Sequence, residues 1–129
     1  MQNATEKRFS PDDVITALLA YLPPEFNNDT EKIHTRMYEL KKEGKYDDLV
    51  GNFEFVKYSR FHYSPLLDRI FNRLQESRLL SSRNPDYIKY QVKDESRKAI
   101  ESYYLEKGKI LFEQRERLKE IAVRLSEEL

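Results

Sequence analysis

Two segments of the chain begin with a Ser-Pro dipeptide, and apolar residues follow each of them at helical spacing. A serine side chain can cap the first turn of a helix, and proline fits the first helical position because an N–H there would lack a helical partner. The apolar residues within 14–22 and 66–74 each form one stripe. We therefore predict helices over residues 11–22 and 65–78.

The region between these two helices is expected to hold a third helix and a short strand. A helix is predicted to start at residue 29 or 30 and to end at Gly44. Residues 53–58 are rich in aromatic and β-branched side chains, which favours a strand. Residues 47–50 could form a helical turn before it.

The segment after residue 78 is predicted to form a β-hairpin. Residues 81–86 are turn formers, and residues 87–92 alternate between two faces as strand residues do. The tip of this hairpin carries Arg83 and is therefore basic.

Asp94 can cap a long helix that runs to the C-terminus, and Gly108 is a point where this helix could bend or divide. Apolar residues recur every seven positions in this region, a spacing typical of helices that pack against another helix. The pattern predicts a homodimer with contacts at Leu111, Leu118, Ile121 and Leu125. The alternative is that these residues cover the protein's own core.

Composition limits the classes of protein to which this chain can belong. Its 129 residues suit one domain, with residues 1–93 as the main unit, 94–129 as the C-terminal helix and 23–28 as a linker. The absence of cysteine excludes disulfides and thiolate-based sites. The sequence has neither an apolar run of membrane-spanning length nor the apolar core of a signal peptide, so we expect a cytoplasmic protein with no membrane partner.

No group of residues in the sequence has the pattern of a catalytic or metal site. His62 is close to Ser64 and Asp68, but no nucleophile elbow accompanies them. His34 lacks the three or four converging ligands that a zinc centre needs. The 3 glycines form no phosphate-binding loop. We therefore expect no enzymatic activity, no cofactor and no metal ion.

The charged residues are unevenly distributed although the net charge is zero. Residues 57–98 carry ten basic and five acidic side chains, a net charge of +5, whereas residues 1–56 carry a net charge of −4. Because exposed charges are screened beyond about 10 Å, a local excess of this kind decides whether a polyanion is attracted. The middle of the chain is therefore the candidate for nucleic-acid binding.

The order of elements is that expected of a winged helix-turn-helix domain, with one rearrangement in the position of the first strand. Two helices and an extended segment precede a helix with an Arg/Asn face, and a hairpin follows it. The expected fold class is therefore mainly α (α+β), with a winged helix-turn-helix-like domain, a small β-hairpin and a long C-terminal helix. In such domains the third helix enters the major groove of DNA, and the hairpin tip touches phosphates or the minor groove.

This interpretation gives each predicted contact a role. Arginine and asparagine can each form two hydrogen bonds to a base edge, so Arg69, Asn72 and Arg73 are expected to contact bases. The expected backbone contacts are Arg60, Tyr63, Ser64, Arg83 and Lys89. Double-stranded DNA is the expected partner, and the chain is interpreted as a transcriptional regulator.

The run FVKYSRFHYSPLLDRIFNRLQESRLLSS, residues 55–82, resembles a pattern found in bacterial winged-helix proteins similar to the Panacea (antitoxin-type) domain. An aromatic strand there leads to a Tyr-Ser-Pro helix start and a leucine-rich helix. His62 and Arg78 depart from the glycine-proline and the small residue usual at their positions. The resemblance implies a prokaryotic regulator or antitoxin that acts by DNA or protein contact.

Two alternatives to duplex binding remain open. Asp68 and Glu76 lie on the expected reading face and would repel phosphates, which favours a winged-helix module that binds another protein and no nucleic acid. The aromatic residues within 53–90, interspersed with basic residues, could instead stack on the bases of single strands. Core packing is the simpler role for most of these rings.

Overall fold

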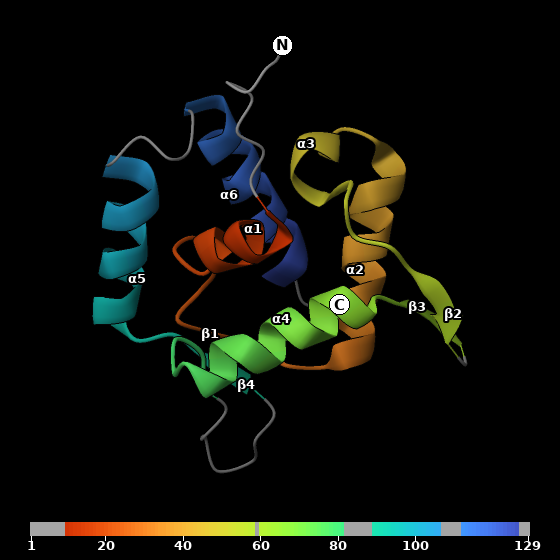
Figure 1. Cartoon of the computed structure of the whole chain (residues 1–129), viewed down its shortest axis with the longest axis horizontal. Coiled ribbons are helices and arrows are strands. Elements are labelled where there is room, and N and C mark those ends of the chain that lie inside the picture. Colours follow the sequence, from red (N-terminus) through yellow and green to blue (C-terminus); the bar gives the residue numbers. More distant parts are fainter. Residues whose placement is uncertain (1–9, 59, 82–88, 107–111, 127–129) are drawn as a thin grey trace.

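The computed structural model describes residues 10–58, 60–81, 89–106 and 112–126, and its described part is mainly helical with two small antiparallel sheets (Figure 1). The helices are α1 (Pro11–Leu18), α2 (Thr30–Glu43), α3 (Asp47–Val50), α4 (Pro65–Glu76), α5 (Asp94–Glu101), the π-helix η1 (Ser102–Glu106) and α6 (Phe112–Ser126). The strands are β1 (Glu25–Asn27), β2 (Val56–Tyr58), β3 (Phe61–Tyr63) and β4 (Lys89–Gln91).

The caps at the helix ends confirm the predicted helix starts. The Ser10 hydroxyl accepts a hydrogen bond from Asp13 N at 3.1 Å, and the Asp29 carboxylate accepts one from Lys32 N at 3.2 Å. Gly44 ends α2 in the left-handed conformation, with φ 75°, as the sequence predicts.

The first sheet differs from the prediction because it includes a segment that we expected to be a linker. β1 lies within residues 23–28 and pairs with β4, with Phe26 opposite Tyr90. Ser81 forms an isolated bridge to Gln91 on the other edge of β4. Buried Phe26 was the only apolar signal in that segment, and three residues are too few to show an alternating pattern. The predicted hairpin tip, residues 82–88, lies outside the described residues.

The second sheet is a hairpin of β2 and β3 inserted between α2 and α4. Its first strand occupies the second half of the predicted strand 53–58, while Phe53 is completely buried before the strand begins. The hairpin packs against α2 through ring stacks: Tyr63 lies 4.8 Å from His34 and His62 lies 3.8 Å from Tyr38, between ring centroids. The hairpin is therefore fastened to α2 by its aromatic side chains.

The C-terminal region is not one long helix. Figure 1 shows α5 at the edge of the molecule and α6 behind α1, and α6 packs against α1 and α2. Gly108, the predicted bend, lies outside the described residues.

The predicted dimer contacts Leu118 and Ile121 are wrong, because both are completely buried in the same core as α1 and α2. Leu125 is partly buried against that core, and Leu111 lies outside the described residues. A seven-residue apolar repeat marks one face of a helix but does not say whether that face meets the same chain or a second one.

Candidate nucleic-acid interface

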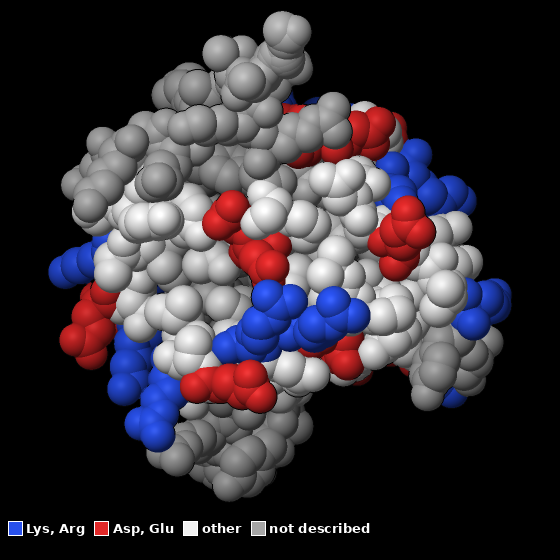
Figure 2. All heavy atoms as spheres, in the orientation of Figure 1, with Lys and Arg blue, Asp and Glu red and all other residues white. Residues whose placement is uncertain are grey.

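α4 lies on the outside of the molecule, with one apolar face buried and one polar face exposed. Its buried residues are Leu67, Ile70, Phe71 and Leu74, at the spacing of one helix face. The exposed residues include Arg69, Asn72, Arg73 and Glu76. α4 crosses the front of the molecule in Figure 1, and Figure 2, in the same orientation, shows basic side chains over it.

Arg69 and Asn72 are the predicted base contacts that the structure leaves available. Both are exposed, and neither forms a hydrogen bond or ion pair with any of the described residues. They lie three positions apart on α4, so they point to the same side of the helix. This spacing places a guanidinium and a carboxamide beside each other on the exposed side of the helix.

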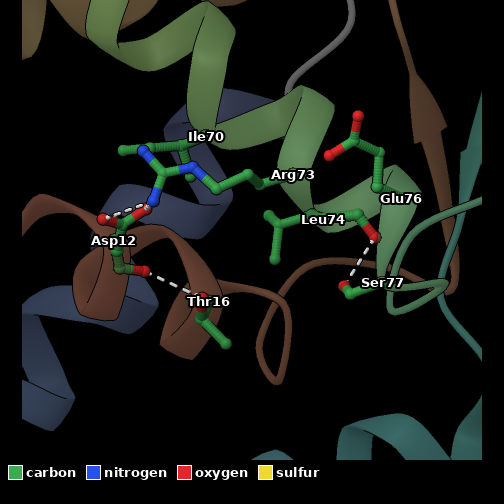
Figure 3. A pocket seen from close by; sticks show the side chains of 7 residues that line it. All are labelled: Asp12, Thr16, Ile70, Arg73, Leu74, Glu76 and Ser77. Atoms are coloured by element: carbon green, nitrogen blue, oxygen red, sulfur yellow. Dashed lines mark hydrogen bonds and ion pairs between the residues drawn. The ribbon is translucent and has the colours of Figure 1, made fainter.

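Arg73 is paired with an acidic residue of α1. Its Nη1 lies 3.1 Å from both carboxylate oxygens of Asp12 (Figure 3), and the two side chains are 50% and 45% exposed. An exposed pair of this kind is worth about 0–1 kcal/mol, so a phosphate could replace the carboxylate at little cost. The pair lies beside an open groove between α1 and α4, which Thr16, Leu74 and Ser77 also line.

Acidic side chains lie beside the basic ones on this face. Figure 2 shows them above and below the basic side chains of α4. Asp68 accepts a hydrogen bond from Tyr63 Oη at 2.8 Å, and Glu76 is exposed and extends away from Asp12 (Figure 3). The charge of the α4 face is therefore balanced, unlike the net +5 of residues 57–98.

The basic excess of that segment is divided among several places. Arg97 donates hydrogen bonds to Leu22 O at 2.7 Å and Ala20 O at 3.2 Å. Its guanidinium therefore binds the backbone of the segment that follows α1. Lys57 is exposed on β2, and Lys98 is exposed on α5. Sequence counts give the total charge of a segment but not the face on which each side chain emerges.

The prediction that Ser64 contacts the DNA backbone is wrong. Its side chain is completely buried, and its hydroxyl accepts a hydrogen bond from Leu67 N at 3.2 Å as the cap of α4. The Tyr63 ring is stacked on His34, and its hydroxyl is bonded to Asp68. The polar groups of both residues just before α4 are therefore bonded within the protein, although only Ser64 is buried.

The other predicted backbone contacts are distributed around α4. Arg60 is 81% exposed, and its Nε donates to Glu31 Oε1 at 3.0 Å. Lys89 is exposed on β4, and Arg83 lies outside the described residues.

His34 supports the N-terminal end of α4, a role that the sequence did not reveal. It is 2% exposed, and its Nδ1 accepts a hydrogen bond from Ser64 N at 2.9 Å. Burial lowers the pKa of His34 below its ordinary value, although the Asp68 carboxylate acts in the opposite direction. The neutral ring with its proton on Nε2 is therefore the form that fits this site.

Aromatic side chains considered as an alternative stacking platform contact other rings of the protein. Phe71 stacks on Tyr90 at 5.4 Å, and Phe26 lies 5.6 Å from the same ring. Phe55 packs edge-on against Tyr38. These rings are parts of the packing between elements, while Tyr87 lies outside the described residues.

Within the described residues, no three histidine, aspartate or glutamate side chains are grouped in a way that could hold a metal ion. In the same part of the chain, every helix is too short or too polar to cross a membrane. Comparisons with protein-family models, with curated proteins and with solved structures give no match to this chain.

Proposed function

We propose that this chain is a winged-helix protein that binds duplex DNA by placing α4 in the major groove. The order of elements supports the fold: α1, β1, α2, α4, the strand residue Ser81 and β4 follow one another. β4 pairs with β1 on one edge and with Ser81 on the other, as the returning strand of a wing does. α3 and the β2–β3 hairpin are then an insertion between the second and third helices.

The observation that carries the proposal is the outward face of α4. A helix that enters the major groove needs exposed side chains with several hydrogen-bonding atoms, and Arg69 and Asn72 meet this requirement. Arg73 joins them when a DNA phosphate or base replaces Asp12. A role as a transcription regulator or as an antitoxin-like protein depends on this same contact.

The test is a titration of a labelled random-sequence duplex at low salt, followed by fluorescence anisotropy. We expect the wild-type protein to bind, and Arg69→Ala to lose about tenfold in affinity, as expected when a charged hydrogen-bonding contact is removed. Lys98→Ala is the matched control because it removes one exposed positive charge from α5. Failure of the wild-type protein to bind at low salt would overturn the proposal.

A second candidate function is a winged-helix module that binds another protein and no DNA. The acidic side chains Asp12, Asp68 and Glu76 beside the basic ones favour it, because they reduce the attraction for phosphates. Glu76→Gln separates the two functions. If α4 binds DNA, the loss of this charge raises the affinity for duplex, whereas a module without DNA binding stays unbound.

A further inference from the structure

The junction of Tyr63 and Ser64, where β3 meets α4, is attached to α2 through a buried histidine. His34 Nδ1 accepts a hydrogen bond from Ser64 N at 2.9 Å, and the two residues are 2% and 0% exposed. The His34 ring stacks on Tyr63 at 4.8 Å between centroids and meets the Phe61 ring edge-on at 6.3 Å. One imidazole therefore holds the end of β3 and the cap of α4 against α2.

These contacts require the neutral form of the ring. Nδ1 faces an N–H donor, so it cannot carry a proton of its own while this hydrogen bond exists. A protonated ring would place two N–H groups against each other and would bury a charge. The attached junction and the charged ring therefore exclude each other.

The titratable side chains around the ring come from α2, β3 and α4. Burial has the largest influence and lowers the pKa of His34, while the Asp68 carboxylate of α4 partly offsets it. That carboxylate already accepts a hydrogen bond from Tyr63 Oη of β3 at 2.8 Å. Glu31, one turn earlier on α2, is paired with Arg60 at 3.0 Å. The ring therefore takes up a proton more readily once it has left its site.

The later turns of α4 are anchored independently of His34. Ile70, Phe71 and Leu74 are buried in the main core, and α4 also packs against α1. Loss of the His34 contact would therefore free the junction and leave these core contacts intact. Proteins open locally in this way, without global unfolding, where a segment depends on few contacts.

We propose that acid opens the junction locally. A proton from the solvent is taken up at Nδ1 of His34, the ring leaves its site, and Tyr63 and Ser64 detach from α2 while α4 stays folded. One of the contacts between the β2–β3 hairpin and α2 thus depends on pH. This inference goes beyond the proposed DNA binding and holds whether or not α4 contacts DNA.

The test is amide hydrogen exchange of the whole chain, followed by NMR between pH 7 and pH 5. Exchange is expressed as a protection factor against the intrinsic rate at each pH. We expect the protection of Ser64 N–H to fall by up to tenfold per pH unit below about pH 6.5, because opening is coupled to the uptake of one proton. The N–H groups of Ile70 and Leu74 should keep their protection. An equal fall at all three positions, or no fall at Ser64, would overturn the inference.

Two variants show whether His34 is the group that responds. His34→Gln keeps a hydrogen-bond acceptor but does not titrate, so the protection of Ser64 N–H should stay constant over this pH range. His62→Gln is the matched control, because the His62 ring lies on the same strand but stacks on Tyr38. It should leave the wild-type response unchanged. A response that persists in the His34 variant, or disappears in the His62 variant, would overturn the inference.

A measurement on the wild-type protein decides the question even if the His34 variant does not fold. The ¹⁵N chemical shift of His34 Nδ1 reports its protonation directly. We expect this shift to change over the same pH range in which Ser64 N–H loses protection. Changes in two separate pH ranges would show that protonation of His34 does not open the junction.

Discussion

At the N-terminal end of α4 the polar groups are buried and bonded within the protein, whereas at the C-terminal end Arg78 is exposed and its backbone is strained. Ser64 and His34 together satisfy two backbone N–H groups at the first end. The second end has a cation without a partner among the described residues.

This difference bears on the proposed binding of a polyanion. The sequence suggested contacts before α4, at Tyr63 and Ser64, because a helix N-terminus favours anions. At that end, the backbone N–H groups of Ser64 and Leu67 already donate hydrogen bonds to His34 of α2 and to the Ser64 hydroxyl. The exposed residues of the proposed interface, Arg69, Asn72 and Arg73, lie along the helix instead.

The largest expected effect comes from His34→Leu. The substitution leaves Ser64 N buried without an acceptor and removes the stack on Tyr63, so we expect a loss of about 2–3 kcal/mol in unfolding free energy. Urea denaturation measures it. His62→Leu is the control, since it removes a similar ring stack on Tyr38 with no backbone hydrogen bond among the described contacts, and it should cost less.

Ser64→Ala should have the next largest effect. Loss of a serine cap costs about 0.5–2 kcal/mol, and the upper half of that range applies where the freed N–H is buried. Ser10→Ala removes the other Ser-Pro cap, which is exposed. Its cost in unfolding free energy should therefore lie in the lower half of the same range. Equal losses of unfolding free energy for the two variants would show that burial of the cap does not matter.

These two serines also show what the sequence could predict. The Ser-Pro signal located both helix starts, because capping depends on residues three positions apart in the chain. Burial of Ser64 depends on α2 and the β2–β3 hairpin, which are brought together only in the fold. The residue that packs against a capped helix end, here His34, is therefore determined by the tertiary structure.

The same limit applies to the candidate site and to the C-terminal helices. Helix periodicity placed Arg69, Asn72 and Arg73 correctly on the polar side of α4. It could not predict the pair of Arg73 with Asp12, which are 61 positions apart, or the burial of Leu118 against α1 and α2. Such contacts follow from how helices pack, and a single apolar stripe fits several packings.

The effect of pH on the unfolding free energy should be smaller than the effects of the two substitutions above. Because burial lowers the pKa of His34 in the folded protein, the unfolded chain takes up the proton first, at its ordinary value near 6.5. The contribution of His34 is complete above about pH 6.5 and is lost as the pH falls below it, by at most about 1.4 kcal/mol per pH unit.

His34→Gln checks that this pH dependence arises at the N-terminal end of α4. Glutamine can accept a hydrogen bond but does not titrate, so the loss of stability between about pH 6.5 and 5 should be smaller than in the wild-type protein. Urea denaturation at several pH values measures the difference. An unchanged pH profile would assign the effect to groups other than His34.

The smallest effects are expected at the helix ends with positive φ, and they should have opposite signs. Arg78→Gly relieves the strained conformation but gives the unfolded chain more freedom, so we expect a net gain of at most about 1 kcal/mol. Gly44→Ala introduces the same strain at a site with no atom within 4 Å of the new Cβ, and should cost about 1 kcal/mol. Thermal unfolding measures both changes. A loss of more than about 1 kcal/mol in the Arg78→Gly variant would exceed the entropy cost of glycine and would mean that the arginine side chain stabilises the end of α4. The two ends of this helix would then no longer differ in this respect.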